Sequence, residues 1–401
     1  MLIQRANKYR AEPTPYQAQA MGQWVGACYN IGLEQRIDAR RRGVWLDYNM
    51  QAKELTTCRT MADWLTFTPV HALQYALQSL EDAFARFRSG QNDHPTPRKK
   101  FKNDAFTLPA EDVEFKRLNK NVGAIKLPKI GWVHFRGFRK LGGKLRSVTF
   151  RRKGRHWHVS AAWDREIPDP PRIEEPSIGI DRGVVVFAAT SVGQIIDPVN
   201  AFAGIRDNLA KLQKRLARKV KFSSNWRKLK GKISRLRVHE ANARKDFLHK
   251  ESTALAKSHG VYRAEKLRVK NMTASAKGNA EAPGKNVAQK AGLNRSILDQ
   301  GWGMFATFLG YKLAERGGRL EFVPAPYTSL RCPAEGCGHI HEDNRPTRNR
   351  FCCVACGFEG HADVVGAINI SQARTLAVEP PKRIRKRVGK RKPVEGIKHA
   401  A

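Results

Sequence analysis

The chain carries seven cysteines, and five of them fall within one short segment, residues 332–356. Cys332 and Cys337 form one close pair, Cys353 and Cys356 form another, and fifteen residues separate the pairs. Two tight turns that each present two thiolates are typical of a structural Zn²⁺ site with four tetrahedral sulfur ligands. Residues that permit such turns stand beside the pairs, at Pro333, Gly338 and Gly357. The spacing therefore predicts a small zinc-stabilised module.

Other residues of this segment compete for the same role. Pairing Cys352 with Cys356 leaves three residues between them, so Cys353 is the better ligand. The histidines rank below the cysteines, and they are His339, His341 and His361. Free buried cysteines are the other interpretation. Four thiolates leave the ion no open position, so we expect it to hold structure, and an odd, clustered set of cysteines indicates a reducing compartment.

Positive charge dominates the composition. Lys and Arg number 74 and Asp and Glu number 36, which gives a net charge of +38 spread along the sequence. A polyanion, most commonly nucleic acid, is the expected partner; a merely soluble basic protein is the other interpretation. No apolar run approaches the ~18 residues of a membrane span, and the first residues lack a secretory signal. We therefore expect a cytoplasmic protein with no membrane partner and two or three domains.

The hydrophobic pattern of the first half changes its period once. One apolar stripe at helical spacing predicts a helix over 70–87, formed by Leu73, Leu77, Leu80, Phe84 and Phe87. A further helix over 15–36 completes an expected helical subdomain, 16–92. Alternating segments then predict a small antiparallel barrel or sheet over 105–165, with strands at 123–127, 131–135, 145–151 and 156–163. Turn-rich linkers are expected at 89–100 and 167–176.

Strands and helices alternate in the second half. Residues 177–190 predict two strands broken at 181–183, and 261–267 predict another. Between them, 205–250 hold sixteen Lys and Arg against three Asp and Glu, and leucines at helical spacing predict two antiparallel helices broken near 222–225. Such one-sided charge favours phosphate contact over a solvated face, and the candidate contacts are Lys211, Arg215, Lys228 and Arg235. A mobile loop is expected over 273–294, helices over 296–313 and 363–374, and a disordered basic tail over 376–401.

Three carboxylates follow predicted strands or begin a predicted helix. Asp181 comes after the apolar run 178–180, Glu265 lies at the end of the next strand, and Asp363 begins the helix after the cysteines. Each alone is most simply a turn residue. Carboxylates gathered near a polyanion need a cation to cancel their repulsion. Two Mg²⁺ ions would do so, and they would also hold the attacking and leaving oxygens of a phosphodiester.

Ordered stretches along nearly the whole chain resemble one family. They are ANKYRAEPTPYQ near the start, HALQYALQSLEDAFARF at 71–87, IKLPKIGWV at 125–133, GIDRGV at 179–184, AEKLRVKNM at 264–272, DQGWGMF at 299–305 and the block TSLRCPAEGCG, FCCVACG and ADVVGAINI. In this order they resemble TnpB, the family of transposon-encoded RNA-guided nucleases, and the related compact type V CRISPR effectors.

The resemblance implies a multidomain α+β protein. An RNase H-like (RuvC) α/β nuclease domain would cover 177–326 and 358–375, with a zinc-binding target-nucleic-acid domain, a zinc ribbon, inserted at 327–357. An N-terminal oligonucleotide-binding β-barrel (wedge) domain would cover 1–15 and 93–170, with a helical recognition domain inserted at 16–92. The basic tail would cover 376–401.

The resemblance also implies a function. A guide RNA would direct the protein to double-stranded DNA beside a short adjacent motif, and the RuvC site would cut it with Mg²⁺, most simply two ions, on Asp181, Glu265 and Asp363. The motif-reading helix would fall on 70–87, where His71 and Gln74 are candidates to touch base edges. We expect a prokaryotic, cytoplasmic protein that associates with the nucleoid when it acts, and we assume a monomer.

Three departures from the family pattern keep alternatives open. The first cysteine pair has four intervening residues where two are common, His361 stands where many members have an acid, and Val365 and Gly366 replace a frequent Asn-Ala. The alternatives are a compact type V CRISPR effector, a non-cleaving RNA-guided DNA-binding regulator, and a conventional transposase that joins DNA ends. The presence of all three acids favours a nuclease.

Overall fold

The structure is a computed structural model that describes residues 1–24, 27–98, 104–138, 142–154, 156–279, 283–324 and 327–373. The chain forms two compact units, Met1–Asp169 and Pro170–Ala401. Each unit has its own sheet and its own hydrophobic core, so the protein is a mixed α+β protein, as expected. The predicted disordered tail, 376–401, lies outside the described residues. No described helix is long and apolar enough to cross a membrane.

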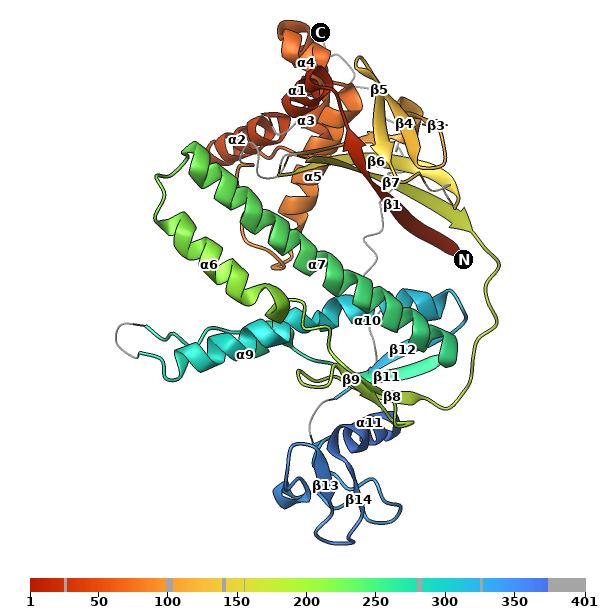
Figure 1. Cartoon of the computed structure of the whole chain (residues 1–401). Helices are drawn as coiled ribbons and strands as arrows, with labels where there is room; N and C mark the ends of the chain where they lie inside the picture. The colour runs from red at the N-terminus through yellow and green to blue at the C-terminus, as the bar shows by residue number, and fades with distance from the viewer. Residues whose placement is uncertain are drawn as a thin grey trace, which may run out of the picture. The chain divides into compact units, whose positions relative to one another are not determined.

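The first unit is built on a seven-stranded antiparallel sheet in the order β2-β6-β7-β1-β5-β4-β3 (Figure 1). Its central strand β1 (Leu2–Glu12) pairs with β7 on one side and β5 on the other. A closed barrel was one expectation, but among the described strands β2 and β3 are the two edges, so the strands form an open sheet. The remaining strands are β2 (Ala105–Pro109), β3 (Glu114–Arg117), β4 (Val122–Leu127), β5 (Gly131–Arg136), β6 (Lys144–Lys153) and β7 (His156–Glu166).

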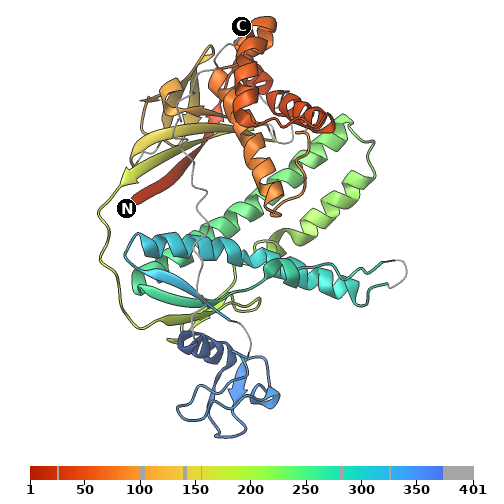
Figure 2. The same cartoon turned by 180° about the vertical axis from the view of Figure 1, so that it is seen from behind.

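Helices follow β1 in the sequence and pack beside this sheet (Figure 2). The stripe predicted over 70–87 is confirmed: Leu73, Leu77 and Leu80 of α5 are buried, whereas Phe87 is 41% exposed at the end of the helix. The elements are α1 (Pro15–Gln23), α2 (Ala27–Arg41), α3 (Tyr48–Met61), α4 (Asp63–Phe67), α5 (Val70–Arg88) and the short η1 (Ala110–Asp112).

The single helix predicted over 15–36 is wrong, because the structure has α1 and α2 there. Trp24, after the end of α1, packs edge-on against Phe106 of the sheet, with ring centroids 5.3 Å apart. Cys28, one turn later, instead packs with Leu73 in a separate cluster. Side chains that enter two different cores require the chain to change direction between them.

The second unit holds a five-stranded sheet in the order β10-β9-β8-β11-β12. Strands β8, β11 and β12 are parallel. Strand β9 runs antiparallel to β8, and β10 pairs antiparallel with β9 to form a hairpin. The apolar run 184–189 forms a strand only at its end, since the Gly183 amide donates to the Phe187 carbonyl and closes a turn. The strands are β8 (Ile178–Asp181), β9 (Ala188–Thr190), β10 (Ile195–Ile196), β11 (Val261–Glu265) and β12 (Arg319–Val323).

Two long basic helices and a broken pair of helices complete this unit. The predicted antiparallel helices over 205–250 are α6 (Arg206–Ala217) and α7 (Ser224–Ser258), which follow η2 (Ala203–Ile205) (Figure 1). The predicted loop over 273–294 is corrected: α8 (Val269–Met272) ends near its start, and α9 (Val287–Gln300) begins inside it. The helix predicted over 296–313 is divided between α9 and α10 (Trp302–Ala314) by Gly301, whose φ of +70° ends one helix and starts the next. The last elements are η3 (Glu342–Asn344), β13 (Arg350–Cys352), β14 (Glu359–His361) and α11 (Ala362–Gln372).

Candidate active site and metal centre

Two of the three predicted acids lie at the carboxyl ends of neighbouring parallel strands. In the pairing of β8 with β11, Ile180 is opposite Ala264, so the next residues, Asp181 and Glu265, end the two strands side by side. Carboxyl ends of parallel strands meet at one edge of a sheet, where ligands commonly bind. The sequence predicts both acids at strand ends, and the structure has them there.

Helix α11 carries the third acid to the same edge. It packs directly on β8 because Gly179 has no side chain: a Cβ atom there would lie 1.8 Å from the Ala367 carbonyl oxygen. At Gly366 a Cβ atom would lie 2.8 Å from Oδ2 of Asp181. The departure from the family pattern at this position thus leaves room for the Asp181 carboxylate. Asp363, in the first turn of α11, faces the same carboxylate closely enough to repel it.

Electrostatic repulsion concentrates on Asp181. Burial, and then the nearby charges of Glu265 and Asp363, raise the pKa of Asp181 to about 7. Burial also raises the pKa of Glu265, opposed by a hydrogen bond from Thr328 and by the charge of Arg182. Oxygen donors that repel one another are the donor set that a hard divalent cation such as Mg²⁺ prefers. The residues fit such an ion, although their oxygens are not all within 4.8 Å of one another in this structure.

Three neighbours orient the acids, and sequence reasoning assigned a role to none of them. Arg345, from the segment between the cysteine pairs, donates from Nη2 to Oδ1 of Asp363 at 3.0 Å. The Thr328 hydroxyl donates to Oε1 of Glu265, and the Arg182 guanidinium donates to the Glu265 carbonyl. Arg182 and Thr328 stand inside stretches that carry the family resemblance, but no pattern around Arg345 marks it. Only the folded module brings Arg345 to the acids.

The four predicted cysteines form one cluster. Sγ of Cys332 lies 3.6 Å from Sγ of Cys356, Sγ of Cys337 lies 3.8 Å from Sγ of Cys353, and all four atoms are within 4.8 Å of one another. A zinc ion with Zn–S bonds of ~2.3 Å in a regular tetrahedron requires sulfur atoms about 3.8 Å apart. The donor set therefore fits a structural zinc ion. Cys352 does not join the cluster, since its Sγ faces Oε1 of Glu359 at 3.6 Å.

Buried Asn344 fastens the two cysteine turns together. Its Nδ2 donates to the carbonyls of Leu330 and His339 before and after the first pair, at 2.9 and 3.1 Å. Its Oδ1 accepts from the amide of Val354 within the second pair, at 3.0 Å. The side chain thus closes the module independently of any ion.

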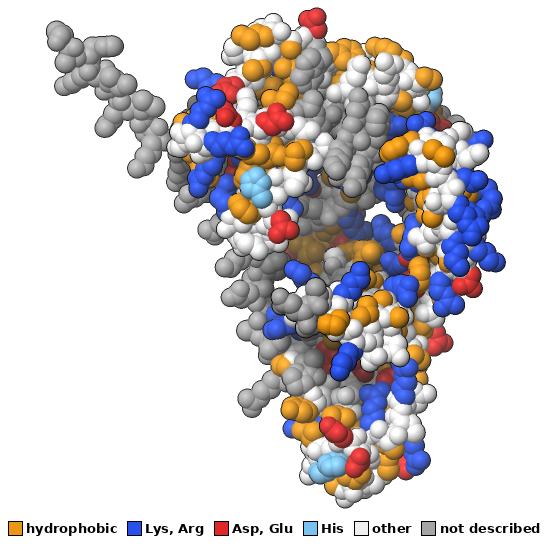
Figure 3. Space-filling view, turned by 90° about the vertical axis from the view of Figure 1, so that its left-hand side faces the viewer, with side chains coloured by type: hydrophobic (Ala, Val, Ile, Leu, Met, Phe, Trp, Pro, Cys, Tyr) orange, Lys and Arg blue, Asp and Glu red, His pale blue; other side chains and the backbone are white. Residues whose placement is uncertain are grey.

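The four predicted contacts on the basic helices are all solvent-exposed. Lys211 and Arg215 lie on α6, and Lys228 and Arg235 lie on α7. On the face shown in Figure 3, Lys and Arg side chains far outnumber Asp and Glu side chains. Exposed cations in such excess attract a phosphate backbone electrostatically, whatever its base sequence.

The two candidates for base contact, His71 and Gln74, lie on α5 in the first unit, whereas the three acids belong to the second unit. Nδ1 of His71 is 2.8 Å from Oδ2 of Asp112, and Nε2 lies 3.7 Å from Oε1 of Glu111. Asp112 therefore engages Nδ1 by a hydrogen bond, whereas Nε2 faces Glu111 beyond hydrogen-bond distance. Gln74 is half-buried on the same helix. Their contact with bases remains a prediction.

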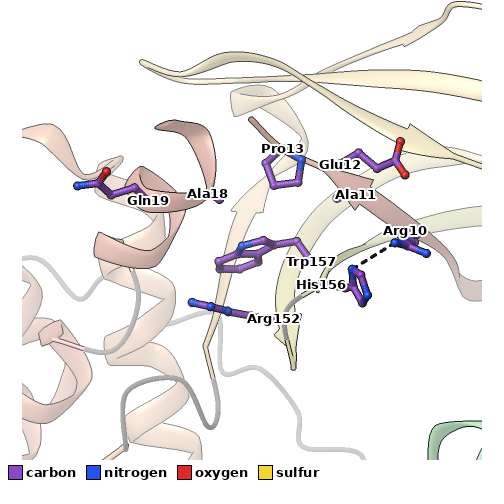
Figure 4. Close-up of a pocket in the computed structure, with 9 residues that line it drawn as sticks. All are labelled: Arg10, Ala11, Glu12, Pro13, Ala18, Gln19, Arg152, His156 and Trp157. Atoms are coloured by element: carbon purple, nitrogen blue, oxygen red, sulfur yellow. Dashed lines mark hydrogen bonds between the residues drawn. The ribbon is translucent and has the colours of Figure 1, made fainter. Parts of the chain in front are cut away.

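A polar cavity of about 390 Å³ opens at one end of the first unit's sheet (Figure 4). Nη2 of Arg10 lies 3.2 Å from Nδ1 of His156, and the Trp157 ring stands between them and the Arg152 side chain. Glu12, also in the lining, is paired with Arg136 at 2.6 Å. The guanidinium groups suit an anion such as a phosphate, whereas the Trp157 ring is buried in the core. The whole lining is Arg10, Ala11, Glu12, Pro13, Ala18, Gln19, Arg152, His156 and Trp157.

Comparison with known proteins gives the family. The chain is 38% identical over 375 residues to the "Putative RNA-guided DNA endonuclease InsQ" of Escherichia coli (strain K12), and the match covers 92% of each chain. The chain belongs to the TnpB family. A second relative, a "Putative RNA-guided DNA endonuclease" of Streptomyces pristinaespiralis, is 27% identical and covers 94% of this chain and 90% of its own.

Matches to parts of the chain fall on the elements that carry the site. Residues 160–276, with Asp181 and Glu265, match the family described as "Probable transposase". Residues 302–370, with the cysteines and Asp363, match "Cas12f1-like, TNB domain", and residues 1–43 match "Helix-turn-helix domain". Among solved structures, the Cas12f1 chain of a Cas12f1-sgRNA-target DNA complex shares the fold at a TM-score of 0.58 and 14% identity, covering 88% of this chain and 82% of that one. This chain and that Cas12f1 chain thus share a fold.

Proposed function

We propose that the protein is an RNA-guided DNA endonuclease that cuts double-stranded target DNA next to a short adjacent motif. The observation that carries this proposal is the meeting of Asp181, Glu265 and Asp363 at one end of a parallel sheet. The full-length relationship to a protein named as such an endonuclease supports it. The partners follow from the proposal: a guide RNA and the target DNA, for which the exposed cations of α6 and α7 are suited.

The domain layout belongs to the same proposal. A hairpin next to a parallel strand, two further parallel strands and a helix packed on the first of them agree with an RNase H-like (RuvC) domain over 177–326 and 358–375. The cysteine module, 327–357, is the inserted zinc ribbon. The first unit supplies the oligonucleotide-binding wedge over 1–15 and 93–170 and the helical recognition domain over 16–92. The tail, 376–401, remains assigned from sequence alone.

The acids and their neighbours have different roles in hydrolysis: the acids would bind metal ions, and the neighbours hold the acids in position. When bound by the three carboxylates, two Mg²⁺ ions supply activation of the attacking water and stabilisation of the leaving 3′-oxygen. Thr328 fixes Glu265 through its hydroxyl, and Arg345 fixes Asp363 through its guanidinium. Arg345 also adds a positive charge beside the acids, which favours approach of a phosphodiester. Burial and the neighbouring acids raise the pKa of Asp181 to about 7, so a bound cation would favour its ionised form.

The test compares acid variants for cleavage and for binding. Asp181→Ala and Asp363→Ala should abolish Mg²⁺-dependent cleavage of a matched plasmid and leave binding of RNA and DNA nearly intact. Asp197→Ala, an exposed carboxylate of the same unit, is the matched control and should cut normally. Equal loss of binding in the acid variants would make the acids structural and defeat the proposal.

The same assays separate the alternatives. A wild-type protein that binds its matched target but never cuts it belongs with the non-cleaving regulators, a result that Val365 in place of a frequent Asn would then help to explain. Sequencing the RNA that co-purifies separates the transposon and CRISPR settings. An RNA overlapping the gene's own 3′ end supports the first, and a repeat-spacer RNA supports the second.

A further inference from the structure

The turn that joins α6 to α7 exposes apolar side chains in a strongly basic segment of the protein. We call residues 218–226 the hairpin tip. Val220 is 80% exposed and Phe222 is 61% exposed. Scattered exposed apolar residues are ordinary, but here two of them stand among exposed Lys219, Lys221 and Arg227. Solubility alone would favour polar residues at this position.

The backbone of the tip is strained in a way that keeps an aromatic ring in place. Phe222 has a φ of +68°, a left-handed conformation that glycine or asparagine adopts far more easily. The next residue, Ser223, caps α7 by accepting from the Trp226 amide at 3.2 Å. A turn required only to start α7 would be more stable with glycine. An aromatic side chain retained at a strained position indicates that its ring has a role.

The ring belongs to a small aromatic and cationic group. The centroids of Phe222 and Trp226 are 5.4 Å apart, with their planes inclined at 58°. Nζ of Lys221 lies 5.5 Å from the Phe222 centroid, and Nζ of Lys230 lies 4.5 Å from the Trp226 centroid. Aromatic faces next to lysines are the combination that single-stranded nucleic acid requires, a ring for the base and a cation for the phosphate.

We propose that the hairpin tip binds an unpaired nucleobase by stacking it on Phe222 and Trp226. Two rings offer far less than the ~800 Å² that each partner buries in a stable protein interface, and the surrounding lysines match a polyanion. The inference rests on the proposed function and deepens it, because it assigns this surface to bases where the rest of the hairpin meets phosphates. The base can come from the guide RNA or from an opened DNA strand, since stacking does not distinguish them.

The experiment measures binding by the full-length protein in buffer free of Mg²⁺, so cleavage plays no part. The probes are a 20-nucleotide RNA containing 2-aminopurine, a DNA of the same sequence, and the duplex of each. Phe222→Ala and Trp226→Ala should weaken single-strand binding about tenfold and reduce 2-aminopurine quenching, with duplex binding unchanged. The salt dependence of binding should keep its slope because no phosphate contact is lost, whereas Lys228→Ala should lower the slope by about one.

Two further variants keep the outcome decisive. Phe222→Gly removes the ring and the strain together, so it should keep or raise the melting temperature and still lose quenching, which a purely structural ring would not do. Val192→Ala, at an apolar side chain 58% exposed in another turn of the same unit, should change nothing.

If affinity and quenching fall only with the RNA probe, the stacked base belongs to the guide RNA. If they fall only with the DNA probe, it belongs to an opened DNA strand. Unchanged quenching and affinity for both probes in Phe222→Ala and Trp226→Ala overturn the inference and leave the tip to a protein partner. Because cleavage by the wild type and its loss in Asp181→Ala are measured separately, that failure would not touch the proposed nuclease.

Discussion

At the scale of single residues, the acids of the site reduce the stability of the metal-free protein. The pKa of Asp181 is raised to about 7, so the folded chain holds this proton more tightly than the unfolded chain does. The ionisation of Asp181 therefore lowers the free energy of unfolding. This free energy is unaffected below about pH 4, falls as the pH rises from about 4 to about 7, and stays low above that. Functional carboxylates brought together in this way commonly trade stability for activity.

Asp181→Asn should accordingly stabilise the metal-free protein. We expect a gain on the order of 2 kcal/mol at pH 8 and almost none at pH 4, because the neutral amide buries no charge and meets no repulsion from Glu265 or Asp363. Thermal unfolding across that pH range, in buffer free of Mg²⁺, measures it. Adding Mg²⁺ should then stabilise the wild type more than the variant. A variant no more stable than the wild type at pH 8 would show that the repulsion is relieved in some other way.

Arg345 tests how far one neighbour supports the acids. Arg345→Ala removes the guanidinium that fixes Asp363 and the positive charge beside the site, so cleavage should fall about 10- to 100-fold. RNA binding and zinc content should be unchanged, because Arg345 is not one of the residues that would bind the zinc ion. Arg348→Ala, an exposed arginine three residues later, is the control. Full activity of Arg345→Ala would show that the contact between Arg345 and Asp363 is a surface ion pair with no effect on cleavage.

The residues of the site differ in how well the sequence predicts them. Asp181 and Glu265 follow apolar strands, and Asp363 begins a helix, so each has a local signal. Arg345 has none, because its position depends on the cysteine turns and on Asn344, whose contacts join segments distant in the sequence. Local patterns identify residues that the backbone places, and they miss residues that tertiary contacts place.

At the scale of elements, the same distinction explains which helices and strands were predicted. Helix α5 was found because five apolar residues repeat along one face. The first part of helix α9 was missed because the segment 273–294 is rich in Ala, Gly, Lys and Asn, and the helix buries few side chains, among them Ile297. The division between α1 and α2 was missed because Trp24 and Cys28 fit one helical face in sequence yet pack into different cores.

The contact between β8 and α11 is the element-scale feature on which the site depends. Gly179→Ala would place a Cβ atom 1.8 Å from the Ala367 carbonyl, so the helix must move away from the strand. We expect about 1–3 kcal/mol of destabilisation, together with a loss of cleavage larger than stability explains, since Asp363 moves with α11. Chemical denaturation and cleavage of a matched plasmid at a temperature where the variant is folded measure the two effects.

Gly303→Ala is the matched control for this change. Gly303 lies in α10 with no atom within 4 Å of an added Cβ, and alanine favours helix. The control should be neutral or slightly stabilising and should cut normally. If Gly179→Ala behaved the same way, the close approach of α11 to β8 would not be what places Asp363.

At the scale of the whole molecule, the cysteine module and the acids form one cooperative structure. Cys332, Cys353 and Phe351 share a buried cluster with Ala362 and Val365 of α11. The module also supplies Arg345 to Asp363. Loss of the zinc ligands should therefore disturb the acid site as well as the module, although the four clustered cysteines are not hydrogen-bonded to Asp181, Glu265 or Asp363.

Adjacent cysteines provide the comparison that tests this coupling. Cys353→Ser removes one of the four clustered sulfurs, and we expect loss of bound zinc, a melting temperature lower by several degrees and little or no cleavage. Cys352→Ser, one residue away and facing Glu359, should keep its zinc, its stability and its activity. Metal analysis, thermal unfolding and plasmid cleavage follow the three quantities. RNA binding by Cys353→Ser should persist, because α7 packs in a different hydrophobic cluster and α6 packs on α7. Retained cleavage in a zinc-free Cys353→Ser protein would show that α11 holds Asp363 in place by its contact with β8 alone.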